Sequence, residues 1–68
     1  MSNKEIFFSF EPEWASVRLG YVRELSDKAK IEIERIYRED IDKTWLPNRY
    51  CKACYFTAIK TLIEFYDK

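Results

Sequence analysis

The chain has 68 residues, of which 47% are hydrophobic and 18% aromatic. Its 12 basic residues balance 12 acidic residues, and it contains no histidine. This composition excludes an intrinsically disordered chain and argues against both a strongly basic nucleic-acid-binding surface and an acidic DNA mimic. The length limits the protein to one domain, residues 1–68, around one small core.

The sequence contains no segment with the pattern of a membrane span or a signal peptide. Its uncharged stretches are too short to cross a bilayer, and the first residues, Met1 to Ile6, lack an apolar core. We therefore expect a soluble cytoplasmic protein without a membrane partner.

Residues 1–11 are predicted to form an extended aromatic arm. Ile6, Phe8 and Phe10 would lie on one face of an extended backbone. A segment of this composition favours aggregation if it is left uncovered. We expect the arm to fold back over the helices, to bind a partner, or to cross to a neighbouring copy of the chain.

A long helix is predicted over residues 12–40. Pro12 stands between two glutamates, which suits the first turn and the positive end of a helix dipole. Ser26 is able to start a second helix by capping, but an apolar stripe continues past it without a change of register and favours a single helix. Gly20 falls on the opposite face, where it weakens the helix by about 1 kcal/mol. The stripe consists of Trp14, Val17, Tyr21, Val22, Leu25, Ala29, Ile33 and Ile36.

A connection over residues 41–48 and a helix over residues 49–66 complete the predicted chain. Trp45 and Leu46 are expected to pack across the turn. The apolar face of the last helix is about 180° wide, so one partner helix cannot cover it. We therefore predict a mainly α fold, an antiparallel hairpin of a long and a shorter helix with the extended arm, and oligomerisation as one way to complete the core. The face consists of Cys51, Cys54, Tyr55, Ala58, Ile59, Leu62, Ile63, Phe65 and Tyr66.

Cys51 and Cys54 lie three residues apart at the start of the last helix. This spacing differs from the disulfide frameworks of small secreted proteins, so we expect reduced thiols packed in the core. Two alternatives stay open. A thioredoxin-like redox site would need a preceding β-strand, and a zinc site would need both cysteines from each of two chains, because structural zinc takes four ligands. The run Trp45-Leu46-Pro47 ahead of the cysteines resembles a short run in proteins of phages and mobile elements and implies no residue role.

The usual catalytic sets are missing from the sequence. It has no histidine, no glycine-rich phosphate loop and no nucleophile beside a base. Carboxylates such as Glu32, Glu34 and Glu39 alternate with Lys and Arg, as on a solvated helix surface. We therefore expect neither catalysis nor a cofactor.

A weak basic patch is predicted on the polar side of the last helix. Arg49, Lys52 and Lys60 lie there near Phe56, but the neighbouring Glu64 dilutes their charge. Nucleic-acid binding is therefore the alternative function and not the main prediction.

The favoured function is protein–protein interaction or assembly, with another protein or with further copies of the chain. An apolar face this wide is rare on a small soluble monomer, and aromatic side chains dominate the energetics of interfaces. The alternative is a small nucleic-acid-binding regulator, with or without the interchain zinc site at Cys51 and Cys54. The residues expected to anchor a partner are Phe7, Phe8, Phe10, Trp14, Phe56, Phe65 and Tyr66.

Overall fold

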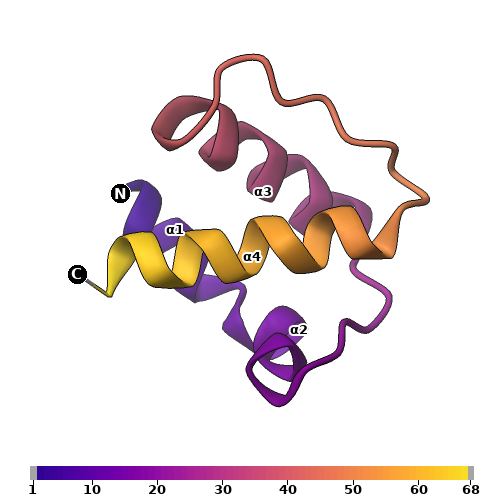
Figure 1. Ribbon diagram of the computed structural model, residues 1–68. Helices are drawn as coiled ribbons and strands as arrows, with labels where there is room; N and C mark the ends of the chain where they lie inside the picture. The colour runs from indigo at the N-terminus through magenta and orange to yellow at the C-terminus, as the bar shows by residue number, and fades with distance from the viewer. Residues whose placement is uncertain (1, 68) are drawn as a thin grey trace.

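Figure 1 shows the computed structural model of the chain, which describes residues 2–67. The described residues form helices and irregular segments without any β-strand, so the predicted mainly α class is confirmed. No helix among them is long and apolar enough to span a membrane. The helices are α1 (Asn3–Ser9), α2 (Glu11–Trp14), the short 3-10 helix η1 (Ala15–Leu19), α3 (Asp27–Asp40) and α4 (Lys52–Tyr66).

The N-terminal arm is helical and not extended, so this prediction was wrong. The side-chain oxygen of Ser2 accepts a hydrogen bond from the Glu5 backbone N–H at 3.2 Å and caps α1. A serine followed three residues later by glutamate is a helix-start signal that the alternation of apolar side chains obscured. Phe7, which alternation separates from Ile6 and Phe8, is completely buried.

The predicted helix over residues 12–40 is interrupted between α2 and α3. Gly20 ends η1 with a φ of 99°, the left-handed conformation that glycine adopts most readily. Its N–H donates to the Val17 carbonyl at 3.0 Å. An unbroken helix over these residues would be about 43 Å long, whereas the longest dimension of the fold is 24 Å.

The apolar stripe nevertheless predicts correctly which side chains are buried. Tyr21 and Val22, at exposed and half-buried positions, lie within the interruption. The irregular segment of residues 20–26 therefore keeps most of the burial that a continuous helix would have produced. The buried members of the stripe are Trp14, Val17, Leu25, Ala29, Ile33 and Ile36.

Replacing Ser26 by alanine is expected to lower the free energy of unfolding by about 1 kcal/mol. The Ser26 side-chain oxygen accepts a hydrogen bond from the Ala29 N–H at 3.2 Å and caps α3, as the capping alternative predicted. Urea unfolding followed by circular dichroism measures the loss. Ser26→Asn, which keeps a capping oxygen, is the control; equal losses in both variants would show that the cap contributes nothing.

α3 and α4 pack against each other but run in the same direction, so the predicted antiparallel orientation was wrong. At one end, Lys30 Nζ donates to the Arg49 carbonyl at 3.1 Å and joins the start of α3 to the residues just before α4. At the other end, the Tyr66 hydroxyl donates to Asp40 and joins the last residues of the two helices. Residues 41–51 run back between these ends (Figure 1). Their extended reach of about 35 Å exceeds the ~21 Å length of α3, which makes the return possible.

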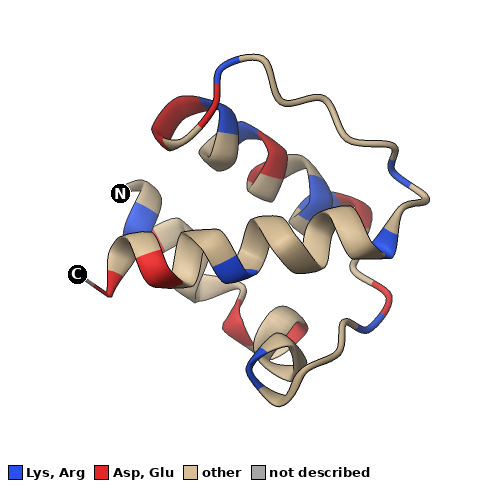
Figure 2. Ribbon diagram, in the orientation of Figure 1, with Lys and Arg blue, Asp and Glu red and all other residues tan. Residues whose placement is uncertain are grey.

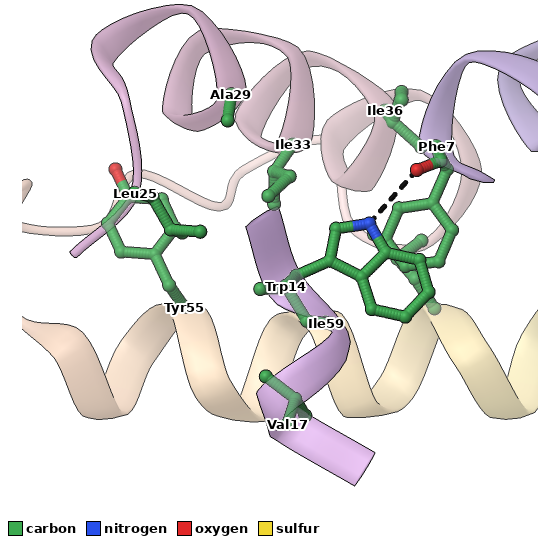
Figure 3. Packing of buried hydrophobic residues seen from close by; sticks show 10 residues of the cluster. Phe7, Trp14, Val17, Leu25, Ala29, Ile33, Ile36, Tyr55 and Ile59 are labelled. Carbon is green, nitrogen blue, oxygen red and sulfur yellow. Dashed lines mark hydrogen bonds between the residues drawn. The ribbon is translucent and has the colours of Figure 1, made fainter. Parts of the chain in front are cut away.

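The wide apolar face of α4 is covered from within the chain. Both α3 and η1 contact α4, while α1 contacts α3 and α2. Figure 3 shows Trp14 between α3 and α4, with Ile33 on one side and Ile59 on the other. The indole N–H of Trp14 donates to the Phe7 carbonyl at 3.0 Å. The buried cluster consists of Phe7, Trp14, Val17, Leu25, Ala29, Ile33, Ile36, Tyr55, Ile59 and Leu62.

Candidate interaction site

A cleft opens at the end of the molecule where α3 and α4 begin. It has a volume of about 250 Å³ and lies between the 20–26 segment, the first turn of α3 and the start of α4. Both helices direct their N-termini to this end because they run in the same direction. We call it the basic cleft, and its lining residues are Val22, Arg23, Glu24, Leu25, Lys30, Arg49, Tyr50, Lys52 and Tyr55.

The basic cleft concentrates positive charge in a chain whose net charge is zero. Four of its lining residues are Lys or Arg, and Glu24 is the one carboxylate among them. Figure 2 shows basic residues in the 20–26 segment, near the end of the connection and at the start of α4. Each helix N-terminus carries about half a positive charge, so α3 and α4 raise the potential of this end further. At the opposite end, α3 finishes on Glu39 and Asp40.

The carboxylate of Glu24 lies between two lysines at the cleft. Its Oε1 is 3.4 Å from Lys30 Nζ, and its Oε2 is 3.4 Å from Lys52 Nζ. The two ammonium groups, Lys52 first, hold the pKa of Glu24 below its usual value. The Glu24 side chain is 71% exposed and that of Lys30 only 13% exposed. The carboxylate therefore lies at the mouth of the cleft, next to a lysine whose side chain is largely buried.

A buried polar cluster supports the floor of the cleft. Tyr55 is almost completely buried, and within the described residues its hydroxyl has no hydrogen-bond partner. Burial, together with the nearby charge of Glu34, raises the pKa of Tyr55 to about 12. Glu34 is also buried, and its Oε2 lies 3.3 Å from Arg49 Nε. Arg49 therefore offsets part of the charge of the buried Glu34 carboxylate. Lys30 Nζ lies 5.9 Å from the centre of the Tyr55 ring.

The connection before α4 exposes two large apolar side chains, and one of them lies at the cleft. Leu46 is 82% exposed and Tyr50 is 94% exposed. Trp45 instead packs against Tyr37 and Tyr55, with ring centres 4.5 and 6.1 Å apart. The predicted packing across the turn is thus made by Trp45 and not by Leu46. Tyr50 lines the cleft itself, so apolar surface and positive charge adjoin there.

Cys51 and Cys54 are joined in a disulfide, so the expectation of reduced thiols was wrong. Cys51 is the N-cap of α4 and has an extended backbone, which brings its Cα to 5.3 Å from that of Cys54, within the range of disulfides. Its sulfur accepts a hydrogen bond from the Cys54 N–H at 3.2 Å. Residues 2–67 contain no β-strand that would place this pair in a thioredoxin-like setting. They also contain no cluster of three or more possible metal ligands, and the interchain zinc site would need the bond to be reduced.

Two of the aromatic residues predicted to anchor a partner lie in the core, and four pack against it. Phe7 and Trp14 are completely buried and stack with 4.4 Å between ring centres, so neither is accessible in the folded chain. Phe65 exposes 44% of its surface. The other four are half-buried against the core: Phe8, Phe10, Phe56 and Tyr66.

The basic patch predicted on the last helix is divided by the structure. Arg49 and Lys52 line the basic cleft, whereas Lys60 lines a separate groove beside Phe56. Sequence reasoning missed Tyr50 as a site residue. A signal for it existed, because Tyr50 belongs to neither helical stripe and so has no predicted place in the core.

Comparisons of the chain with known proteins find no relative. It matches no protein-family model and no curated protein. No solved structure matches it either. The side chains themselves are therefore the basis for inferring a function.

Proposed function

We propose that the chain is a small, non-enzymatic binding protein that contacts another protein, or a further copy of itself, through the connection and the basic cleft. The observation that carries this proposal is the exposure of Leu46 and Tyr50, at 82% and 94%. The same chain buries Phe7 and Trp14 completely, so it has a core in which apolar side chains are hidden from water. Two large apolar side chains outside that core have no stabilising role in the isolated chain.

The composition of this surface is that of a protein interface. Tyr and Arg are enriched among the residues that contribute most to binding energy, and such residues work best within a rim that excludes water. Tyr50 lies between Arg49 and the disulfide-bonded Cys51, which tethers the end of the connection to the first turn of α4. A side chain presented from a tethered segment loses less entropy on binding than one on a free loop.

Binding of nucleic acid is the second candidate, because the cleft gathers four cations around the exposed Tyr50 ring. Single-stranded nucleic acid is bound in this manner, by a basic groove and by rings on which bases stack. Glu24 and Glu34 offset part of that charge, since each pairs with cations of the cleft. The cleft itself lies at one end of the molecule and gathers only four cations, which favours a protein partner over a long phosphate backbone.

The Leu46→Ser/Tyr50→Ser double variant tests the proposal. Immobilised wild-type and variant chains are exposed to a nuclease-treated lysate of the organism that encodes the protein, and captured proteins are quantified by mass spectrometry. Light scattering of each purified chain measures self-association. We expect a captured protein, or a mass above that of the monomer, to fall about tenfold or more in the double variant, as for loss of a strong interface residue. Unfolding in urea should stay unchanged, because both side chains are exposed.

Ile31→Ser is the matched control, since Ile31 is a half-exposed apolar residue of α3 that does not line the basic cleft. It should retain the capture and the native mass of the wild type. Equal capture by the wild type and the Leu46/Tyr50 variant would contradict the proposal, as would a monomer that captures nothing. Capture that occurs only from a lysate without nuclease treatment, and that weakens steeply with salt, would favour the nucleic-acid candidate.

A further inference from the structure

Two lysines of the basic cleft already hold a carboxylate that comes from the chain itself. One oxygen of Glu24 faces Lys30 and the other faces Lys52, each at 3.4 Å. Glu24 belongs to the irregular 20–26 segment, where no helix fixes its backbone. The arrangement shows that the space between the two ammonium groups has the size and charge for one carboxylate.

Besides the two lysines, other residues of the basic cleft are placed to contact a ligand that occupies this carboxylate position. Val22, Leu25 and the Tyr50 ring line the same cleft and offer apolar contacts. Arg23 lines it as well and makes no ion pair with any of the residues 2–67. A ligand that replaces Glu24 would therefore gain contacts that Glu24 does not make.

We propose that the basic cleft binds a short acidic segment of a partner protein, whose carboxylate displaces that of Glu24 from between Lys30 and Lys52. This inference rests on the proposed function, because it identifies the chemistry of the protein partner. Glu24 then acts as an internal competitor that lowers the affinity for weakly acidic segments. The displacement exchanges one carboxylate for another on the same two ammonium groups, and the side chain that leaves, Glu24, is 71% exposed, so it meets little resistance.

The size and charge of the cleft favour a carboxylate on a peptide over the phosphates of a nucleic acid. At about 250 Å³ the cleft is below the usual range for small-molecule pockets, about 300 to 1,000 Å³, and suits one or two side chains of a segment. The buried Glu34 lies 3.3 Å from Arg49, and the exposed Asp27 begins α3 close by. These acids repel a polyanion more than they repel a single carboxylate.

The test measures binding of a short fluorescent peptide of alternating glutamate and leucine residues by fluorescence anisotropy at low salt. Glu24→Gln removes the competing charge, so it should bind this peptide about threefold to fivefold more tightly than the wild type. Lys52→Gln should weaken binding by a similar factor. Lys60→Gln, on the same helix but in the other groove, should leave the affinity unchanged.

Asp27→Asn separates displacement from a general change in charge, because Asp27 is exposed at the same end but forms no ion pair with Lys30 or Lys52. Displacement predicts a change of less than about twofold in this variant. Equal gains in Glu24→Gln and Asp27→Asn would overturn the inference, as would a lack of peptide binding by every variant. Tighter binding of a thymidine oligonucleotide than of the peptide would overturn it too. In any of these cases, capture that depends on Leu46 and Tyr50 would still uphold the proposed function.

Discussion

Replacing Trp14 by alanine is expected to lower the free energy of unfolding by about 3 to 5 kcal/mol. Trp14 is completely buried, its ring stacks on Phe7 with 4.4 Å between centres, and its N–H donates to the Phe7 carbonyl at 3.0 Å. Alanine removes these contacts and leaves a cavity between α3 and α4. A domain of this length has about 3 to 10 kcal/mol of stability in total, at ~0.05 to 0.15 kcal/mol per residue. Much of the population should therefore be unfolded, as measured by thermal and urea unfolding followed by circular dichroism.

Two further variants show how much of this loss of stability comes from the buried ring of Trp14 and how much from its N–H group. Trp14→Phe keeps a ring against Phe7 but loses the N–H donor, and should cost about 1 to 3 kcal/mol. Phe65→Ala removes an aromatic side chain that is 44% exposed and should cost less than about 1 kcal/mol. The prediction would be contradicted if the Trp14→Ala chain were as stable as the wild type but lost partner binding. Trp14 would then be an interface anchor, as predicted from the sequence.

Raising the pH from about 10 to about 12 is expected to lower the free energy of unfolding by about 2 kcal/mol through Tyr55 alone. An unfolded tyrosine titrates near pH 10, whereas burial and the charge of Glu34 raise the pKa of Tyr55 to about 12. Between these values the folded chain keeps a proton that the unfolded chain releases. The stabilisation is therefore complete below about pH 10 and is lost at about 1.4 kcal/mol per pH unit above it. Burial and the hydrogen bond to Asp40 raise the pKa of Tyr66 in the same direction, which adds to the loss.

Urea unfolding at a series of alkaline pH values measures this dependence, and tyrosinate absorbance reports the ionisation of the side chains. Tyr55→Phe should flatten the curve by about the contribution of Tyr55. Tyr50→Phe is the matched control, because Tyr50 is 94% exposed and its replacement should leave the slope unchanged. Identical slopes in all three chains would show that Tyr55 ionises in the folded state as easily as in water.

Along residues 12–40, the apolar periodicity predicted which side chains are buried, whereas the capping signal predicted where a helix begins. Apolar periodicity correctly predicted the burial of Trp14, Leu25 and Ile33, because it reports which side of the local backbone faces other apolar groups. It did not report that the chain leaves the helix at Gly20, because residues on both sides of a break can still face one core. The capping signal at Ser26 was present in the sequence, and here it was the better guide to the boundary of α3.

The N-terminal residues show the same conflict between signals. Ile6, Phe8 and Phe10 suited the alternation of an extended arm, but Ser2 and Glu5 carried a capping pattern that prevails in α1. Burial of Phe7 against Trp14 then uses a side chain that alternation had placed apart from the others. The aromatic residues near the N-terminus thus complete the core, and the two most exposed large apolar side chains, Leu46 and Tyr50, lie in the connection instead.

The sequence by itself determined the mainly helical class, most of the buried stripe, the apolar face of α4 and the cap that begins α3. These features depend on residues within a few positions of one another, so local pattern is sufficient to reveal them. The tertiary structure alone decided that α3 and α4 run in the same direction and that both begin at the basic cleft. It alone decided that Glu24 meets both Lys30 and Lys52. The physical reason is that these contacts join distant parts of the chain and depend on the path of residues 41–51, which no local periodicity encodes.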